Sequence, residues 1–179
     1  ALLSNLPKSP GSITWSPDGK HLAFQMFVED KPASLASPPP KPEGAEWAAP
    51  VKVIDKYPYR RDGPGYLDVG FTHIFVIPAD GGTPRQLTSG DHDHGGTLSW
   101  SPDSSTIVFS ANRGDRIEDP FESDIWSVTV ATGEMTQLTD NNGPDTSPQY
   151  SPDGKSIAYL GVVDKGMGYH NAHVYLLAV

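Results

Sequence analysis

Two histidines flanked by aspartates form the most metal-like run of this sequence. The segment GDHDHGG places His92 and His94 two residues apart, with Asp91 and Asp93 beside them. Residues i and i+2 share one face of a strand, so a two-histidine metal site is geometrically possible. No third ligand follows at a useful spacing, and the run connects two segments with strand patterns. We therefore predict no metal site, and we expect a histidine ring that bridges neighbouring backbones.

Two adjacent arginines, Arg60 and Arg61, offer a second kind of chemistry. Guanidinium groups bind carboxylates through paired hydrogen bonds. The carboxylate belongs either to a substrate or neighbouring domain, or to Asp62 or Asp68 of this chain. We favour the internal ion pair, and the binding role stays open as the alternative.

Covalent catalysis of the serine hydrolase kind requires a nucleophile on a strained turn, a histidine base and an acid. The 179 residues contain neither the nucleophile-elbow pattern G-x-S-x-G nor a phosphate-binding loop. Cysteine is absent as well, which excludes disulfides and thiolate metal sites. We therefore predict no catalytic residue and no cofactor within these residues.

The composition favours short strands and tight turns. Glycine and proline number 18 each, and long helices do not tolerate so many of these residues. The net charge of -9 argues against a nucleic-acid partner, which usually meets a basic face. No apolar run approaches the ~20 residues of a membrane span, so we expect no membrane partner.

Three segments of similar sequence reveal an internal repeat. The anchors Trp100 and Tyr150 lie 50 residues apart, and Phe75 and Trp126 lie 51 apart. A period near 50 with four short strands per unit is typical of β-propeller blades. The repeated segments read ITWSPDGKHLAFQM from Ile13, LSWSPDSSTIVFSA from Leu98 and PQYSPDGKSIAYLG from Pro148.

A Ser-Pro-Asp turn joins two strands in every repeat. Proline presets the second turn position, and Gly19 and Gly154 then supply the left-handed residue of the first and third repeats. Ser104 stands at that place in the second repeat, where we expect a little backbone strain. We interpret the serines and aspartates of these turns as architecture and not as catalytic groups.

The fold class that follows is all-β: a partial β-propeller of four-stranded antiparallel blades, with about three repeats. Its aromatic and aliphatic rows are expected to pack blade against blade, and two blade faces are left without a neighbour. The isolated chain is therefore expected to be marginally stable, to oligomerise, or to be held by other chain segments. The predicted divisions are 1–30 and 67–90 for the first blade, 31–66 for an insertion, 91–140 for the second blade and 141–179 for a third, incomplete blade.

The insertion differs from the rest of the chain in composition. It contains eight of the 18 prolines and carries a net charge of +2, whereas the remaining residues carry -11. Such a proline-rich segment is extended or irregular and cannot form a blade strand. Long loops of this kind are often functional.

The blade pattern, W/Y-SPDG-x-x-I-A-F followed by I-x-x-V-x-x-D/T-G and L-T, resembles that of TolB-like propellers. The segment YRRDGPGYLDVGFTHIFVIPADGGTPRQLTSGDHDHGG from Tyr59, together with FSANR from Phe109, resembles more specifically the N-terminal propeller of prolyl oligopeptidase family serine peptidases. Within that family the acylaminoacyl-peptidase and dipeptidyl-peptidase branch is the most similar. The resemblance covers nearly the whole chain, and about three blades against the family's seven or so indicate a portion of a larger enzyme.

The resemblance implies a non-catalytic propeller that gates short peptides for an α/β-hydrolase domain of the same protein. None of the family's catalytic residues corresponds to a residue of this chain. The candidate substrate-binding residues are Arg60, Arg61 and Tyr66 of the insertion, and Arg113 at the end of its strand. Arg113 meets a peptide carboxylate or, alternatively, anchors an acidic loop. That loop carries Asp115, Glu118 and Asp119.

Two further expectations concern the whole protein. A TolB-like interaction propeller without enzymatic activity is the alternative function, and further repeats followed by a stop after residue 179 would favour it over a peptidase. The family resemblance suggests the bacterial cytoplasm or periplasm as the location, with short peptides and the hydrolase domain as partners. A homo-oligomer is possible on the same grounds as the unpaired blade faces.

Overall fold

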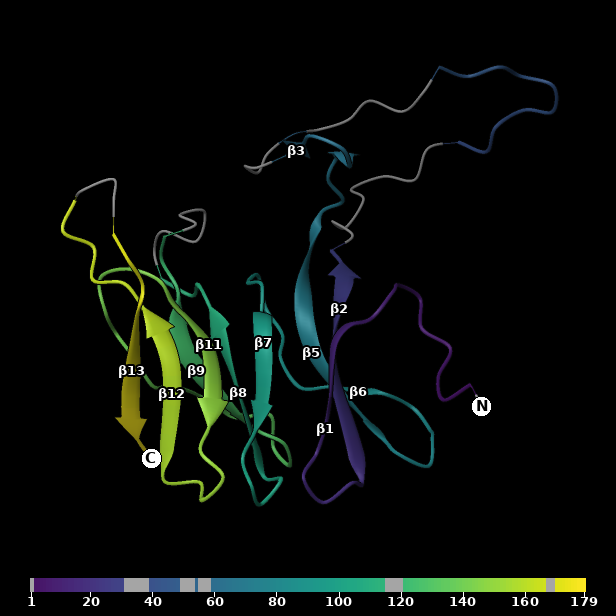
Figure 1. Ribbon diagram of the computed structural model, residues 1–179. Coiled ribbons are helices and arrows are strands. Elements are labelled where there is room, and N and C mark those ends of the chain that lie inside the picture. The colour runs from purple at the N-terminus through teal and green to yellow at the C-terminus, as the bar shows by residue number, and fades with distance from the viewer. Residues whose placement is uncertain (1, 31–38, 49–53, 55–58, 115–120, 167–169) are drawn as a thin grey trace.

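The computed structural model describes residues 2–30, 39–48, 54, 59–114, 121–166 and 170–179, and every strand pair in these ranges is antiparallel. All but two of the strands in these ranges form three sheets that stand side by side, and the other two, β3 (Arg60–Arg61) and β4 (Gly65–Tyr66), form a small sheet of their own (Figure 1). The first sheet has the order β1-β2-β5-β6 and contains β1 (Gly11–Trp15), β2 (His21–Glu29), β5 (Gly70–Pro78) and β6 (Arg85–Gln86).

The second and third sheets repeat this arrangement. The second sheet has the order β10-β9-β8-β7 and contains β7 (Gly95–Trp100), β8 (Thr106–Ala111), β9 (Asp124–Thr129) and β10 (Met135–Gln137). The third has three strands, β11 (Asp145–Tyr150), β12 (Ser156–Gly161) and β13 (His173–Ala178). The all-β prediction with four-stranded antiparallel blades is confirmed. No helix among the described residues is long and apolar enough to cross a membrane.

The Ser-Pro-Asp turns have the structural role predicted from the sequence. In each turn the serine hydroxyl donates to the aspartate carboxylate, at 2.6, 2.6 and 2.7 Å in the first, second and third sheets. The same carboxylates accept the backbone N–H of Lys20, Ser105 and Lys155 two residues later. These hydrogen bonds lower the pKa of each aspartate, so the carboxylates are charged and serve to fix the turns.

Ser104 adopts the left-handed conformation that its place in the repeat requires. Its φ is 62°, close to the 71° of Gly19 and Gly154 at the equivalent positions. The Ser104 hydroxyl accepts a hydrogen bond from the backbone N–H of Asp18 in the first sheet, at 3.1 Å. The strained residue therefore links two neighbouring sheets, which a glycine cannot do through a side chain.

Replacing Ser104 by alanine is expected to lower the free energy of unfolding by about 1–2 kcal/mol, because the bond to Asp18 is lost and the strain remains. Ser104→Gly loses the same bond but relieves the strain, so its stability should stay close to that of the native chain. Urea unfolding of both variants, followed by tryptophan fluorescence, measures the difference. Equal losses in the two variants would contradict this account of the strain.

The sheets pack face to face through two buried clusters. The first cluster joins the first two sheets, with Ile74 and Val76 of β5 against Ile107 and Phe109 of β8. The second joins sheets two and three, and includes Ile157 of β12. Seven of the largest fully buried side chains are aliphatic or aromatic residues of these two clusters, so the core lies between the blades and not within a single sheet.

The outer faces of the stack are partly open. Trp100 is 6% exposed between the first two sheets, whereas Trp15 at the corresponding place in the first sheet is 57% exposed. The exposure of Trp15 agrees with the prediction that two blade faces are left without a neighbour, because no described sheet lies on that face. Leu3 and Leu6 pack against the part of this face formed by Phe24.

Val174 and Leu176 of β13 are exposed on the opposite end of the stack.

Candidate functional site

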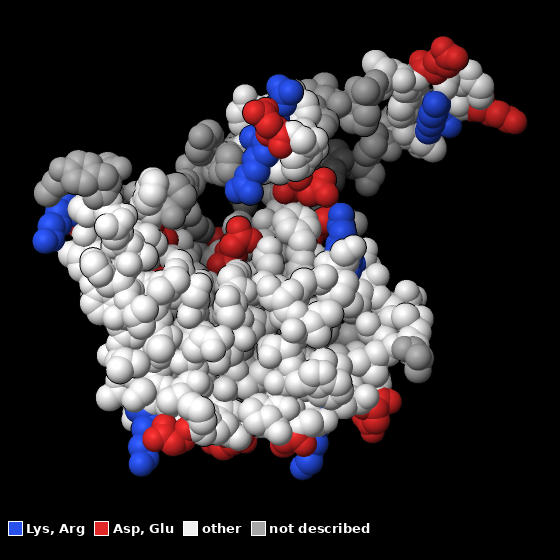
Figure 2. Space-filling model, in the orientation of Figure 1, with Lys and Arg blue, Asp and Glu red and all other residues white. Residues whose placement is uncertain are grey.

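The long connections gather at one edge of the stack of sheets, which is formed by the ends of strands and not by an edge strand. Strands β2, β8 and β12 all end at this edge, because antiparallel strands place alternate connections on opposite edges (Figure 1). The short Ser-Pro-Asp turns lie at the other edge. Figure 2 shows Lys, Arg, Asp and Glu collected at these two rims, with few charges on the face between them. The edge with the long connections carries all four predicted site residues.

Arg113 follows β8 and is held from two sides. One terminal nitrogen of its guanidinium lies 2.7 Å from Nε2 of His94. The guanidinium carbon lies 5.3 Å from the ring centre of Trp126 on β9, which is a cation–π contact. Burial lowers the pKa of the guanidinium, which still remains charged at neutral pH. Among the described residues, the ion pairs do not include a carboxylate bound to Arg113.

The alternative partners of Arg113 lie outside the described residues. The acidic loop that contains Asp115, Glu118 and Asp119 falls in the range 115–120. The prediction that this loop anchors Arg113 therefore stays a prediction. What the structure does show is a neutral side chain, His94, as the hydrogen-bond partner of the guanidinium.

His94 is fully buried between the first two sheets. Its Nδ1 lies 3.2 Å from Nδ1 of His73, which is on β5 and 5% exposed. The His94 ring meets Phe109 edge-on at 5.6 Å, and its backbone N–H donates to the Thr72 carbonyl. The His94 ring therefore connects a side chain of the first sheet, His73, with one that follows β8 of the second sheet, Arg113.

Burial dominates the electrostatics of these histidines. It lowers the pKa of His94 to about 3, with further lowering by the charges of His73 and Arg113. It also lowers the pKa of His73, although the nearby Asp93 opposes that shift. Both imidazoles are therefore neutral at pH 7. His73 could not be found from the sequence, because a single histidine within the strand FTHIF gives no signal that it faces another histidine.

The metal-like run has a structural role in this site. The Asp93 carboxylate accepts the backbone N–H of Thr72 at 2.6 Å, which fixes the run against β5. Within the described part of the chain, no group of three His, Asp or Glu side chains is placed to hold a metal ion.

The predicted residues of the insertion form a separate hairpin. Arg60 and Arg61 make up β3 (Arg60–Arg61), which pairs with β4 (Gly65–Tyr66), and all three predicted side chains are exposed. The rings of Tyr59 and Tyr66 lie 6.3 Å apart. The hairpin strands contact each other and no other described strand. Residues 31–38, 49–53 and 55–58 of the insertion lie outside the described ranges.

The internal ion pair favoured for these arginines is not what the structure shows. Asp68 lies 3.3 Å from the ammonium of Lys8, which also bonds Glu29 at 2.6 Å. No ion pair within the described residues joins Asp62 to Arg60 or Arg61. Closeness in sequence did not predict the partner of Asp68, because Asp68 pairs with Lys8, which is distant along the chain.

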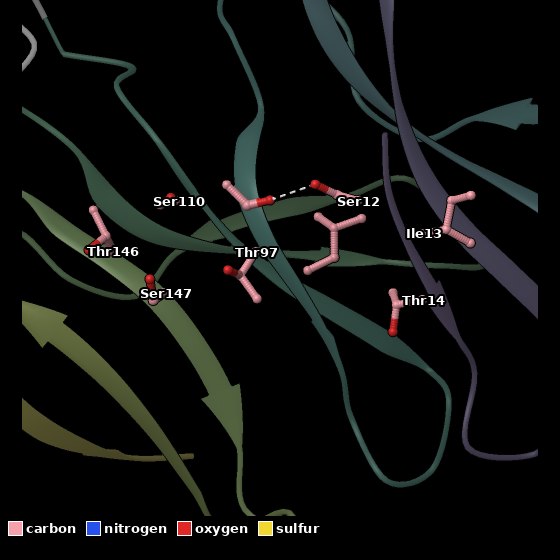
Figure 3. Close-up of a pocket in the computed structure, with 9 residues that line it drawn as sticks. Ser12, Ile13, Thr14, Thr97, Ser110, Thr146 and Ser147 are labelled. Carbon is pink, nitrogen blue, oxygen red and sulfur yellow. Dashed lines mark hydrogen bonds between the residues drawn. The ribbon is translucent and has the colours of Figure 1, made fainter. Parts of the chain in front are cut away.

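A cavity of about 540 Å³ lies among the first strands of the three sheets. Figure 3 shows its hydroxyl groups, and the Ser12 hydroxyl donates to the Gly96 carbonyl at 3.2 Å. Ser12 and Ser147 have φ values of 49° and 55°, next to irregularities in the register of β1 and β11. The lining is uncharged, so it suits polar neutral groups better than ions. The lining residues are Ser12, Ile13, Thr14, Gly96, Thr97, Leu98, Ser110, Thr146 and Ser147.

Comparison with known proteins gives a consistent family. The model of the dipeptidyl peptidase IV (DPP IV) N-terminal region matches residues 48–161. An uncharacterized protein of Agrobacterium fabrum, Atu1656, is 32% identical over 152 residues, which are 81% of this chain and 48% of that protein. The Tol-Pal system protein TolB of Francisella tularensis subsp. mediasiatica is 32% identical over 108 residues, 60% of this chain and 22% of TolB.

A solved structure shares the fold. The acylaminoacyl peptidase of Pyrococcus horikoshii aligns with a TM-score of 0.62 and 17% identity over 99% of this chain and 26% of that protein. At this identity the likeness concerns the fold alone. The chain spans about half or less of the length of each of these proteins.

Proposed function

Because the chain belongs to the family of the dipeptidyl peptidase IV N-terminal region, a propeller region shared by peptidases and TolB proteins, we propose that it gates and orients short peptides for a separate α/β-hydrolase domain. The hydrolase domain supplies the catalytic groups, and this chain contributes none. The observation that carries the proposal is Arg113, a half-buried cation that bonds a neutral histidine at the edge with the long connections.

The chemistry of Arg113 suits a peptide carboxylate. A guanidinium offers five donors, and the bond to His94 uses one of them. Trp126 provides an apolar surface beside the charge, on which the last side chain of a peptide can rest. The exposed Arg60, Arg61 and Tyr66 belong to the same proposal as an outer guide for peptides entering at this edge.

The alternative function is an interaction propeller of the TolB kind. The 32% identity to a Tol-Pal system protein over 108 residues favours it. Such a protein binds a folded partner through an extended surface, and a free peptide carboxylate is not required. The two functions therefore differ in the ligand that Arg113 recognises.

Peptide binding to this chain tests the proposal. An N-acetylated tripeptide with a free carboxylate should bind at least tenfold more tightly than its C-terminal amide, and Arg113→Ala should remove that preference. Titration calorimetry measures both affinities. Lys155→Ala, beside a Ser-Pro-Asp turn at the opposite edge, is the matched control for loss of one positive charge, and it should retain the preference.

Two results would count against the proposal. Equal affinity for the free acid and the amide in the native chain would exclude carboxylate recognition and favour the interaction propeller. An Arg113→Ala variant that still prefers the free acid would move the recognition away from Arg113. If in that case Arg60→Ala/Arg61→Ala abolished the preference, the hairpin would be the carboxylate site instead.

A further inference from the structure

The hydrogen bond between Arg113 and His94 determines where the protons of the two histidines lie. A guanidinium only donates, so Nε2 of His94 accepts and must be unprotonated. A neutral His94 then carries its proton on Nδ1, which faces Nδ1 of His73 at 3.2 Å. That atom of His73 accepts, and the proton of His73 lies on Nε2. The three side chains form a chain of donors and acceptors with one consistent arrangement.

This arrangement does not suit a metal ion between the rings. A metal bound to Nδ1 of His94 would shift the proton of a neutral ring to Nε2. The Nε2–H would then point at the terminal nitrogen of Arg113, 2.7 Å away, and two donors would oppose each other. The same argument applies to protonation of His94, because an imidazolium carries a proton on both nitrogens.

We propose that the His73–His94 pair is a positioning device for Arg113, which fixes the guanidinium through a neutral acceptor and leaves its positive charge available to a ligand carboxylate. The ligand part of this inference rests on the proposed function, whereas the positioning part does not. His94 supplies the acceptor, and His73 holds the His94 ring in the orientation and tautomer that present it.

A neutral anchor matters because of charge. An aspartate or glutamate in place of His94 would hold the guanidinium equally well, but it would cancel most of its charge. Proteins often anchor arginines through carboxylates when the role is structural. Here the anchor, His94, is buried between two sheets. Phe109 packs against its ring, and His73 is the hydrogen-bond partner of its Nδ1. The site therefore combines rigidity with a cation that has no carboxylate partner among the described residues.

The positioning part can be tested without any ligand. Nitrogen-15 NMR of histidine side chains should show the Nδ1–H tautomer for His94 and the Nε2–H tautomer for His73 at pH 7. Rotation of the Arg113 guanidinium about its Nε–Cζ bond should be slow in the native chain and faster in His94→Phe, which fills the space without an acceptor. The opposite tautomers, or equal rotation rates in both chains, would overturn the inference.

The ligand part is tested by three replacements of His94 with the acetylated tripeptide acid as probe. His94→Gln keeps a neutral acceptor, so the affinity should stay within about twofold. His94→Phe removes the acceptor, and His94→Glu keeps the anchor but neutralises the cation, so each should weaken binding about tenfold. In His94→Glu the guanidinium should still rotate slowly, a combination that a purely structural role of His94 does not produce.

The outcomes separate this inference from the proposed function. If the native chain does not prefer the acid over the amide, the proposed function fails, and the NMR results alone decide the positioning of Arg113. If the preference exists and His94→Glu binds the acid as tightly as the native chain, the neutral anchor has no role and the inference fails. Urea unfolding of each variant identifies any that is destabilised, and binding is then compared at a temperature at which that variant is folded.

Discussion

Replacing Phe109 by alanine is expected to lower the free energy of unfolding by about 3–5 kcal/mol. Phe109 is 0% exposed and lies at the contact of the first two sheets, against residues such as Ile74 and Val76. Removal of its ring leaves a cavity that two rigid sheets cannot close, so the lost contacts are not regained. The same ring supports His94, so the site loses its packing together with the core.

Urea unfolding monitored by tryptophan fluorescence measures this effect, since Trp100 and Trp126 lie in or against the same cluster. Phe109→Leu is the matched control, because it keeps most of the apolar volume and should cost much less. A loss below 1 kcal/mol for Phe109→Ala would show that the first two sheets are not packed as described.

Replacing Gly143 by alanine is expected to cost about 3 kcal/mol or more, because two separate penalties act at this position. Its φ is 127°, which side chains rarely adopt, and an added Cβ would overlap the Val162 carbonyl oxygen. The loop cannot move aside easily. The backbone N–H groups of Val162 and Asp164 donate to Pro144 and Asn142, at 3.1 and 2.7 Å, and so hold the two segments together.

Two other glycines separate the penalties. Gly166 has a φ of 72° with open space around it, so Gly166→Ala should show strain alone, about 1–2 kcal/mol. Gly11 has neither feature, and Gly11→Ala should leave stability unchanged or slightly raised. Urea unfolding of the three variants gives the order. A Gly143→Ala loss no larger than that of Gly166→Ala would show that the crowding against Val162 is absent.

The repeating elements were predictable because their signals are local. The Ser-Pro-Asp turns carry their own hydrogen-bond partners within five residues, so Ser104 could be assigned a left-handed conformation from its position alone. The strands on either side were predictable from the alternation of residues such as Phe24 and Phe75, whereas the pairing of these two residues comes from the structure. What lay opposite Ser104 was not predictable, since Asp18 is 86 residues away.

The candidate site was predictable only in part. Arg113 could be selected because an arginine at a strand end near the mouth of a propeller can meet a peptide carboxylate, and the run with His94 was selected for its resemblance to a metal site. Their contact could not be found, because the two residues come from different connections and meet only when the first sheet packs on the second. The ion pair of Lys8 with Asp68 could not be predicted either, because these two residues are also distant along the chain and meet only in the folded protein.

The strands, the turns and the repeat follow from the order of residues, because each depends on residues that are neighbours along the chain. The packing of the sheets is needed to explain which faces are covered, why Trp15 is exposed while Trp100 is buried, and why His73 lies against His94. These facts depend on how whole sheets pack against one another. Buried polar side chains find partners across such contacts, and no spacing in a sequence records which atoms will meet there.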